Sequence, residues 1–247
     1  MERAARTPVW ARQTRGGGRG PQPSLSVDRI VESAVALADT EGVDAVSMRR
    51  VASELGVGTM SLYRYVETKD DLLDLMTDQV MGEALTTPDD PALGWRFRLR
   101  ALALRYRQVM LRHPWAVQIT ATRPPLGPNV LRNTERLLAT LDGLGLTIEQ
   151  MSALSGTVVS YVRGAVVSEI AEAEVARRTG QTEDEYRATV GPYLMQVLAQ
   201  GRHPLLARFV HEVDDALGPA DMFEQGLDWV LDGVGDAVER LVVSGGR

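Results

Sequence analysis

The stretch SMRRVASELGVGTMSLYRYVETKDDLLDLM, Ser47–Met76, carries the pattern that decides the expected fold. It predicts a short helix, a tight turn and a second short helix that crosses the first. Such a crossing needs a small residue where the helices meet, here Ala52, and a glycine free to take positive φ in the turn, here Gly56. Apolar side chains must seal the junction, and these are Val57, Leu62 and Val66. The spacing indicates a helix-turn-helix, although an ordinary helical hairpin would also fit the spacing alone.

The flanking sequence predicts one further helix on each side. Ser26 is an N-cap residue, and Gly42 ends the helix that it starts. The apolar stripe between them has helical spacing: Val27, Ile30, Val31, Ala34 and Ala38. Thr68 caps the helix on the other side, with Asp71 at the capping-box position. The first three of these four helices form the predicted helix-turn-helix domain over residues 26–70, and the helix capped by Thr68 leads into the rest of the chain.

The rest of the chain, residues 71–247, shows helical periodicity broken by proline and glycine, and no convincing strand alternation. Further helices are expected over 92–112, 114–121, 127–142, 147–179, 183–200, 204–217 and 220–243. We therefore expect an all-α fold with a larger helical domain over 71–247. Residues 1–25 are rich in Arg, Gly and Pro. This composition cannot bury a core, so a disordered arm is expected there.

Composition excludes several kinds of site. Cysteine is absent, which excludes disulfides, thiol catalysis and Cys-bearing metal centres. The three histidines, His113, His203 and His211, lie far apart, so neither a metal site nor a cofactor is expected. The longest uncharged run, 188–201, has 14 residues, against roughly 20 for a membrane helix. Because the first residues also lack an apolar signal core, we expect a cytoplasmic protein without membrane contact.

Charge is spread unevenly along the chain. The net charge is −6, but residues 1–70 carry 10 basic and 9 acidic residues, so the acidity lies in 71–247. An acidic balance argues against indiscriminate polyanion binding, but it leaves room for a local basic surface.

The outer face of the second short helix is a candidate surface for the DNA major groove, because small and polar side chains allow close approach to base edges. Tyr63, Tyr65 and Lys69, next to a helix N-terminus, would suit phosphates. The candidate DNA-binding residues are Arg49, Arg50, Thr59, Met60, Ser61, Tyr63, Arg64, Tyr65 and Lys69.

Ser47–Met76, preceded by IVESAVALADTEG (Ile30–Gly42), resembles the TetR family of bacterial transcriptional regulators. The resemblance implies that Thr59, Met60 and Ser61 face bases and that Arg49 reaches bases or phosphate. It implies that Tyr63, Tyr65 and Lys69 clamp phosphates. It also places the protein on the bacterial nucleoid. The arginines of the N-terminal arm could lie in the minor groove or belong to a plain extension.

The remainder resembles the tetracycline-repressor type of C-terminal domain, through Trp95, LRHPWAVQITATRP (Leu111–Pro124) and LGLTIEQMSALSGTVVSYVRGAVVSE (Leu144–Glu169). The resemblance implies a ligand cavity, and six residues lie on helices that would line it unless they are plain core: Tyr106, Met110, Trp115, Ile119, Met151 and Tyr161. Where tetracycline-binding members hold a magnesium–drug chelate with polar groups, this sequence has Leu85, Leu102 and Ile119. A largely apolar effector, bound without metal, is therefore expected. His113, before Pro114, is expected to be structural.

A homodimer is expected through the helices near 147–179 and 220–243. Met151–Val167 is apolar on nearly all sides, as in a helix buried on two faces. The last helix has two stripes. One comprises Phe223, Leu227, Val230, Leu231, Val234, Val238 and Leu241, and the other Met222, Gly226, Trp229, Gly233 and Ala237. Two-fold symmetry would match a palindromic operator in double-stranded DNA.

The function expected from these features is a dimeric, sequence-specific repressor released from its operator by a small effector. An activator, or a constitutive architectural DNA-binding protein with a filled core, would fit much of the same pattern. An enzyme is not expected, because the sequence has no nucleophile motif, metal-ligand spacing or phosphate-binding glycine loop.

Overall fold

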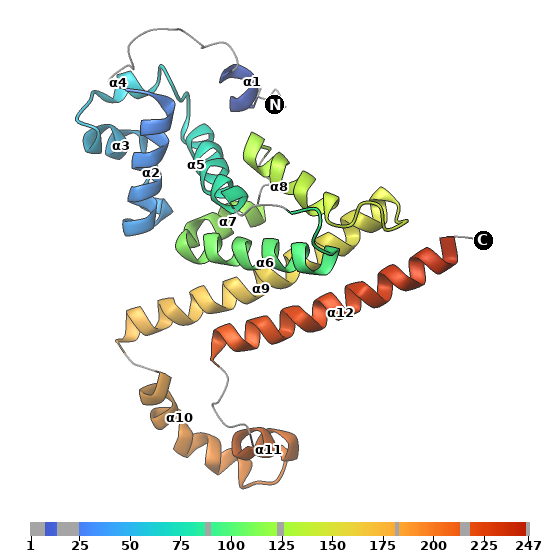
Figure 1. Cartoon of the computed structure of the whole chain (residues 1–247). Coiled ribbons are helices and arrows are strands. Elements are labelled where there is room, and N and C mark those ends of the chain that lie inside the picture. Colours follow the sequence, from blue (N-terminus) through green and yellow to red (C-terminus); the bar gives the residue numbers. More distant parts are fainter. Residues whose placement is uncertain are drawn as a thin grey trace, which may run out of the picture.

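The structure, a computed structural model, describes residues 8–13, 25–86, 90–122, 126–180, 183–212 and 218–245, and every regular element among them is helical (Figure 1). The elements are α1 Val9–Gln13, α2 Val27–Glu41, η1 Val43–Ala45, α3 Met48–Glu54, α4 Thr59–Leu62, α5 Lys69–Glu83, η2 Ala84–Thr86, α6 Trp95–Arg112, α7 Pro114–Thr122, α8 Pro128–Ala139, α9 Ile148–Thr179, α10 Glu183–Leu198, α11 Pro204–Glu212 and α12 Pro219–Gly245. The all-α prediction is confirmed. Among the described residues, no helix is both long and apolar enough to span a membrane.

The predicted helix ends in the N-terminal region carry real caps. The side chains of Ser26, Ser47 and Thr68 each accept a hydrogen bond from the backbone N–H three residues on. Gly56 takes φ +67°, and Val57 N–H donates to the Ala52 carbonyl at 3.0 Å. This closes α3 with a Schellman-type turn that only glycine adopts without strain. The local signals thus fix where α2, α3 and α5 begin and where α3 ends.

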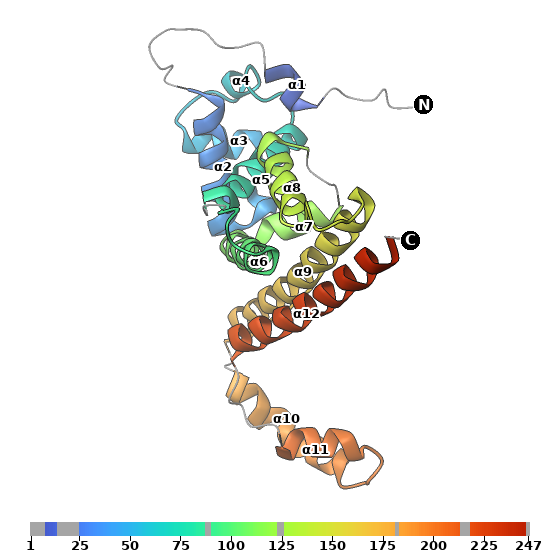
Figure 2. The ribbon, with the colours of Figure 1, turned by 45° about the vertical axis from the view of Figure 1, so that its right-hand side comes forward.

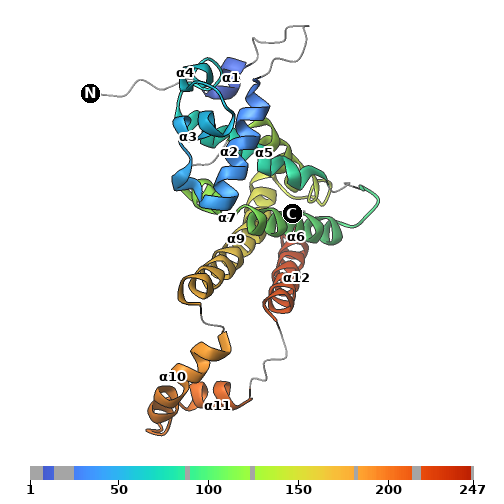
Figure 3. The same ribbon diagram turned by 90° about the vertical axis from the view of Figure 1, so that its left-hand side faces the viewer.

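Helices α2, α3 and α4 form one end of the molecule, and α5 runs from them into the body (Figure 2). In the body, α6 and α7 lie between α5 and the long pair α9 and α12 (Figure 3), and α8 packs against both α5 and α9. Helices α10 and α11 project from the far ends of that pair, away from the other helices (Figures 1 and 2). Their exposed apolar side chains include Tyr193, Leu205 and Phe209.

The expected boundary between residues 70 and 71 falls at the start of α5, a helix shared by both parts. Helix α5 contacts α2 on one side and α8 on another. One continuous apolar core extends from Ile30 and Val51 through Leu72 and Met76 to Leu227. The two parts are therefore coupled by packing.

The first 25 residues differ from the expected disordered arm where the structure describes them. Val9–Gln13 form the short helix α1, which contacts α5. Val9 is only 3% exposed, and Trp10 packs against the same core. The expectation of disorder was thus wrong for residues 9–13. The composition of residues 1–25 as a whole is rich in Arg and Gly, and it conceals the adjacent apolar residues Val9 and Trp10. Residues 1–7 and 14–24 lie outside the described residues.

Buried Asp78 of α5 ties this helix to α8. Its Oδ1 accepts hydrogen bonds from the backbone N–H groups of Asn129 at 2.9 Å and Val130 at 3.0 Å, at the start of α8. Gly127 is required beside it, because a Cβ at that position would collide with the Asp78 carboxylate. Burial raises the pKa of the Asp78 carboxyl above its ordinary 3.8, although the two N–H donors act in the opposite direction.

Helix α12 joins the body through one of its two stripes. Phe223, Leu227, Leu231, Val234 and Val238 are buried. Tyr161 of α9 donates a hydrogen bond from its hydroxyl to the Phe223 carbonyl at 2.9 Å, and the two rings stack. Gly226 leaves room for that hydroxyl. The second stripe, which includes Met222, Trp229 and Gly233, stays exposed.

We predict that Asp78→Ala lowers the free energy of unfolding by about 1–3 kcal/mol, because two buried N–H donors lose their acceptor. Asp78→Asn should cost less, since an amide oxygen can still accept both bonds. Urea unfolding at a fixed protein concentration measures both. Asp236→Ala, at an exposed position of α12, is the control. A loss from Asp78→Ala no larger than that of the control would contradict the role of Asp78.

The raised pKa also fixes the sign of a pH effect. The folded chain binds the Asp78 proton more tightly than the unfolded chain. Binding of this proton therefore adds to the free energy of unfolding. The contribution is fully present below the ordinary pKa of the carboxyl and is lost as pH rises through its raised pKa in the folded chain. Asp78→Asn should therefore reduce the fall in unfolding free energy with rising pH in that window, and urea unfolding at several pH values tests this.

Candidate nucleic-acid interface and ligand cavity

Helix α4 is anchored on its inner side and presents its outer side to solvent. Leu62 and Val66 are fully buried, whereas Met60 is 77% exposed. Thr59 and Ser61, which flank Met60, are half-buried. The regular helix is only four residues long, and residues 63–65 continue it as a turn. The three residues expected to face bases therefore share one short, accessible element.

The basic and aromatic candidates lie beside α4 but differ in how free they are. Arg49, Arg64 and Lys69 are exposed. Tyr63 is 42% exposed, whereas Tyr65 packs partly on the core. Arg50 forms ion pairs with Glu41 at 2.7 Å and Glu54 at 3.1 Å. Arg50 is thus held by two carboxylates on the domain's own surface.

A polar cluster joins the helix-turn-helix region to the body. His113, 4% exposed, places Nδ1 2.8 Å from Asp39 Oδ1 of α2 and Nε2 3.0 Å from Glu83 Oε1 of α5. Trp115 Nε1 donates to the same Asp39 oxygen at 2.7 Å. The structural role expected for His113 agrees with this placement, because the ring bridges two helices.

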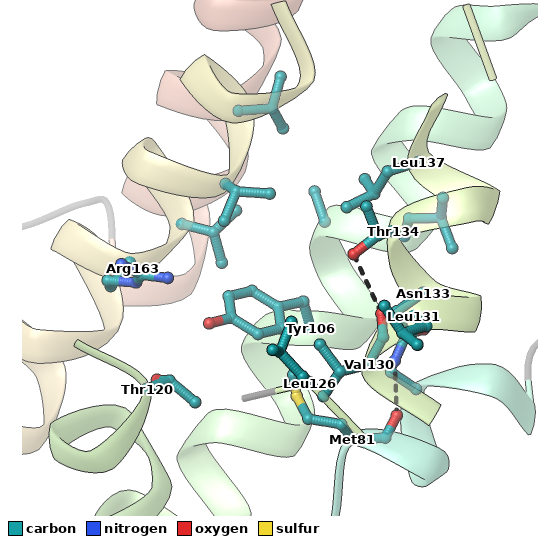
Figure 4. A pocket seen from close by; sticks show the side chains of 16 residues that line it. Met81, Tyr106, Thr120, Leu126, Val130, Leu131, Asn133, Thr134, Leu137 and Arg163 are labelled. Atoms are coloured by element: carbon teal, nitrogen blue, oxygen red, sulfur yellow. Dashed lines mark hydrogen bonds between the residues drawn. The ribbon is translucent and has the colours of Figure 1, made fainter. Parts of the chain in front are cut away.

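A cavity of about 520 Å³ lies between α5, α6, α8 and α9 (Figure 4). This volume is within the range typical of small-molecule sites. The lining residues are Met81, Ala84, Leu102, Ala103, Tyr106, Thr120, Leu126, Val130, Leu131, Asn133, Thr134, Leu137, Val158, Val159, Val162 and Arg163. Most of them are apolar.

Of the six residues expected to bind the ligand, Tyr106 lines this cavity and the other five do not. Met110 is fully buried core. Trp115 faces Asp39, and the Tyr161 hydroxyl is used by Phe223. Ile119 and Met151 pack partly buried against the core. The helices that carry these five residues do border the cavity. Each helix, however, is oriented about its own axis so that these side chains face the core or neighbouring helices.

The cavity residues that sequence reasoning missed come mainly from α8 and α9. Helix α8 contributes Val130, Leu131 and Leu137, and none of its residues counts as fully buried. A signal was available: α8 is strongly amphipathic, and an apolar stripe that faces a cavity looks in sequence like one that faces a core. Arg163, flanked by apolar residues within α9, was a second signal.

An exposed surface of small and apolar residues runs along α9 and α12. Gly156 and Gly164 of α9 have open space where a Cβ would be, as does Gly233 of α12. Trp229 is 67% exposed and Met222 is 62% exposed. These residues include those expected at a dimer interface.

Comparison with known proteins assigns both parts of the chain. Residues 30–76 match the family described as bacterial regulatory proteins, tetR family, and residues 87–238 match the tetracyclin repressor-like C-terminal domain. The HTH-type transcriptional repressor DrrR1 of Streptomyces coeruleorubidus is 43% identical over 217 residues, which cover 87% of this chain and 79% of the relative.

Solved structures give the same result. Apo ActR from Streptomyces coelicolor superposes with a TM-score of 0.73 at 29% identity, covering 89% of this chain and 99% of that one. ActR in complex with actinorhodin superposes at 0.70 with 30% identity and the same coverage. Since the matched segments include most of residues 30–238 and a repressor shares 43% identity, this chain belongs to the TetR family of bacterial transcriptional regulators.

Proposed function

We propose that the protein is a homodimeric repressor that binds a palindromic operator on the bacterial nucleoid and leaves it when a small effector fills the cavity. The observation that carries this proposal is the span of α5. Its first residue is exposed Lys69, beside α4, and Met81, near its other end, lines the cavity. One rigid helix therefore touches both candidate sites.

The DNA-binding part of the proposal rests on exposure and charge around α4. Thr59, Met60 and Ser61 would face bases, with Arg49 reaching bases or phosphate. Tyr63, Arg64, Tyr65 and Lys69 would contact the backbone, which needs cations and hydroxyls. Arg50, held by Glu41 and Glu54, would orient the first turn of α3 and reach phosphate only by exchanging those partners.

The effector part rests on the cavity and its mechanical links. An effector in contact with Met81 and Ala84 would displace the C-terminal end of α5. His113 hydrogen-bonds both to Glu83, at that same end, and to Asp39 of α2. The complex of ActR with actinorhodin supports a ligand in a protein of this fold. The effector can shift the equilibrium only by its difference in affinity for the two forms. A cavity of about 520 Å³ between the helices disfavours the constitutive architectural alternative, which predicts a core filled by side chains.

Selection of genomic DNA fragments by the purified protein, at two salt concentrations, tests the function. We expect a palindrome with half-sites spaced for a two-fold dimer. Weak, salt-sensitive retention with no enriched sequence would contradict the proposal.

Two classes of variant should separate the roles of the interface residues. Lys69→Ala should weaken binding to all DNA sequences and reduce the salt slope by about one unit or less. Thr59→Ala and Ser61→Ala should instead change which sequences bind. Fluorescence anisotropy with the selected operator and a scrambled duplex over a salt series measures both. A Lys69→Ala protein with altered sequence preference and an unchanged slope would show the assignment to be wrong.

A charge on the exposed stripe of α12 should break the proposed dimer. Trp229→Arg would bury a cation in an apolar interface, which is strongly unfavourable. We expect the mass in solution to fall from twice 27.0 kDa to 27.0 kDa, as measured by light scattering after gel filtration. Trp229→Leu, which stays apolar, is the control and should remain dimeric. A dimeric Trp229→Arg protein would place the interface elsewhere.

A further inference from the structure

The cavity holds one formally charged side chain, Arg163. No aspartate or glutamate is among its lining residues. The neutral polar residues there are Tyr106, Thr120, Asn133 and Thr134. A ligand in this cavity therefore meets an apolar wall and a single positive charge.

One hydrogen-bond donor of Arg163 lacks an acceptor among the described residues. Its Nε is buried without a hydrogen-bond partner. Arg107, on the neighbouring helix α6, shows the usual solution, because its Nε and Nη2 donate to the two Glu169 oxygens at 2.9 Å and 2.6 Å. A buried guanidinium donor without such an acceptor destabilises the protein by its desolvation cost, and a ligand that supplies an acceptor removes this cost.

The other donors in the cavity are mostly used within the protein. Asn133 Nδ2 donates to the Met81 carbonyl at 2.7 Å, and Thr134 Oγ1 to the Val130 carbonyl at 3.0 Å. Thr120 Oγ1 donates to the Ala116 carbonyl at 2.9 Å. Figure 4 shows the Tyr106 hydroxyl directed across the cavity toward the side on which Arg163 and Thr120 lie. Arg163 and Tyr106 thus offer their donors from the same side.

We infer that the effector is an organic anion: an apolar skeleton with one acidic group that binds Arg163, with Tyr106 as a second donor. An arginine fork suits a carboxylate or another planar or tetrahedral anion, and such charge-assisted bonds are the stronger ones. The skeleton would lie against Leu102, Val130 and Leu137. A cationic group placed near Arg163 would instead meet like-charge repulsion. This inference rests on the proposed function, because it names the class of molecule that releases the repressor.

Two fluorescent probes with one skeleton test the inference. 1-Anilinonaphthalene-8-sulfonate is an anion, and N-phenyl-1-naphthylamine is its neutral analogue. Fluorescence titration of the 247-residue chain gives a dissociation constant for each probe. We expect the anion to bind about tenfold more tightly or better, because only it supplies an acceptor for Arg163. Arg163→Met should abolish this preference while the neutral probe still binds, and Arg163→Lys should restore part of it.

Two controls locate the effect. Arg178→Met removes an exposed arginine from the same helix and should keep the preference for the anion. Leu137→Trp fills the cavity and should weaken both probes, with thermal unfolding used to show that the variant is folded. Equal affinity of the wild type for the two probes, a preference that survives Arg163→Met, or no binding of either probe would each overturn the inference. Operator selection is a separate measurement, so a failure of the proposed function is distinguished from a failure of this inference.

Discussion

The shared packing of α5 is the constraint on which the rest of this structure depends. Its 15 residues span about 22 Å at the usual rise of an α-helix. One side of α5 packs on α2 and another on α8, with Asp78 holding the first turn of α8. Interiors packed at crystal density do not absorb a displacement locally. In the proposed mechanism, a displacement at Met81 would therefore be carried along α5 toward Lys69.

The cluster around His113 adds a second connection between the same two regions. Packing alone would let the helix-turn-helix end slide, because apolar contacts are not directional. Hydrogen bonds are directional, and those of His113 and Trp115 fix the end of α2 relative to α5 and α7. The combination fixes α2, α5 and α7 relative to one another. This suits the proposed homodimer, in which the spacing between two helix-turn-helix domains would decide whether they fit DNA.

The features that could be predicted from sequence are those determined by neighbouring residues. The caps at Ser26, Ser47 and Thr68 and the turn at Gly56 depend on chemistry within five residues, and all appear in the structure. The cavity wall was not predictable in this way, because it depends on how each helix is rotated against its neighbours. Tyr106 and Met110 lie one turn apart on α6, yet the first lines the cavity and the second is buried in the core.

The chemistry of the cavity bears on how selective the protein can be. Apolar walls such as Leu102 and Val162 discriminate weakly between ligands, since one methylene changes affinity only modestly. A buried polar group without a partner discriminates strongly, because a ligand that fails to satisfy it leaves the whole desolvation cost in place. In this cavity the buried Nε of Arg163, which lacks an acceptor among the described residues, is such a group. Selectivity between ligands then depends on the position of one charge relative to the shape of the apolar wall. Arg163 therefore contributes more to selectivity than its share of the cavity surface would indicate.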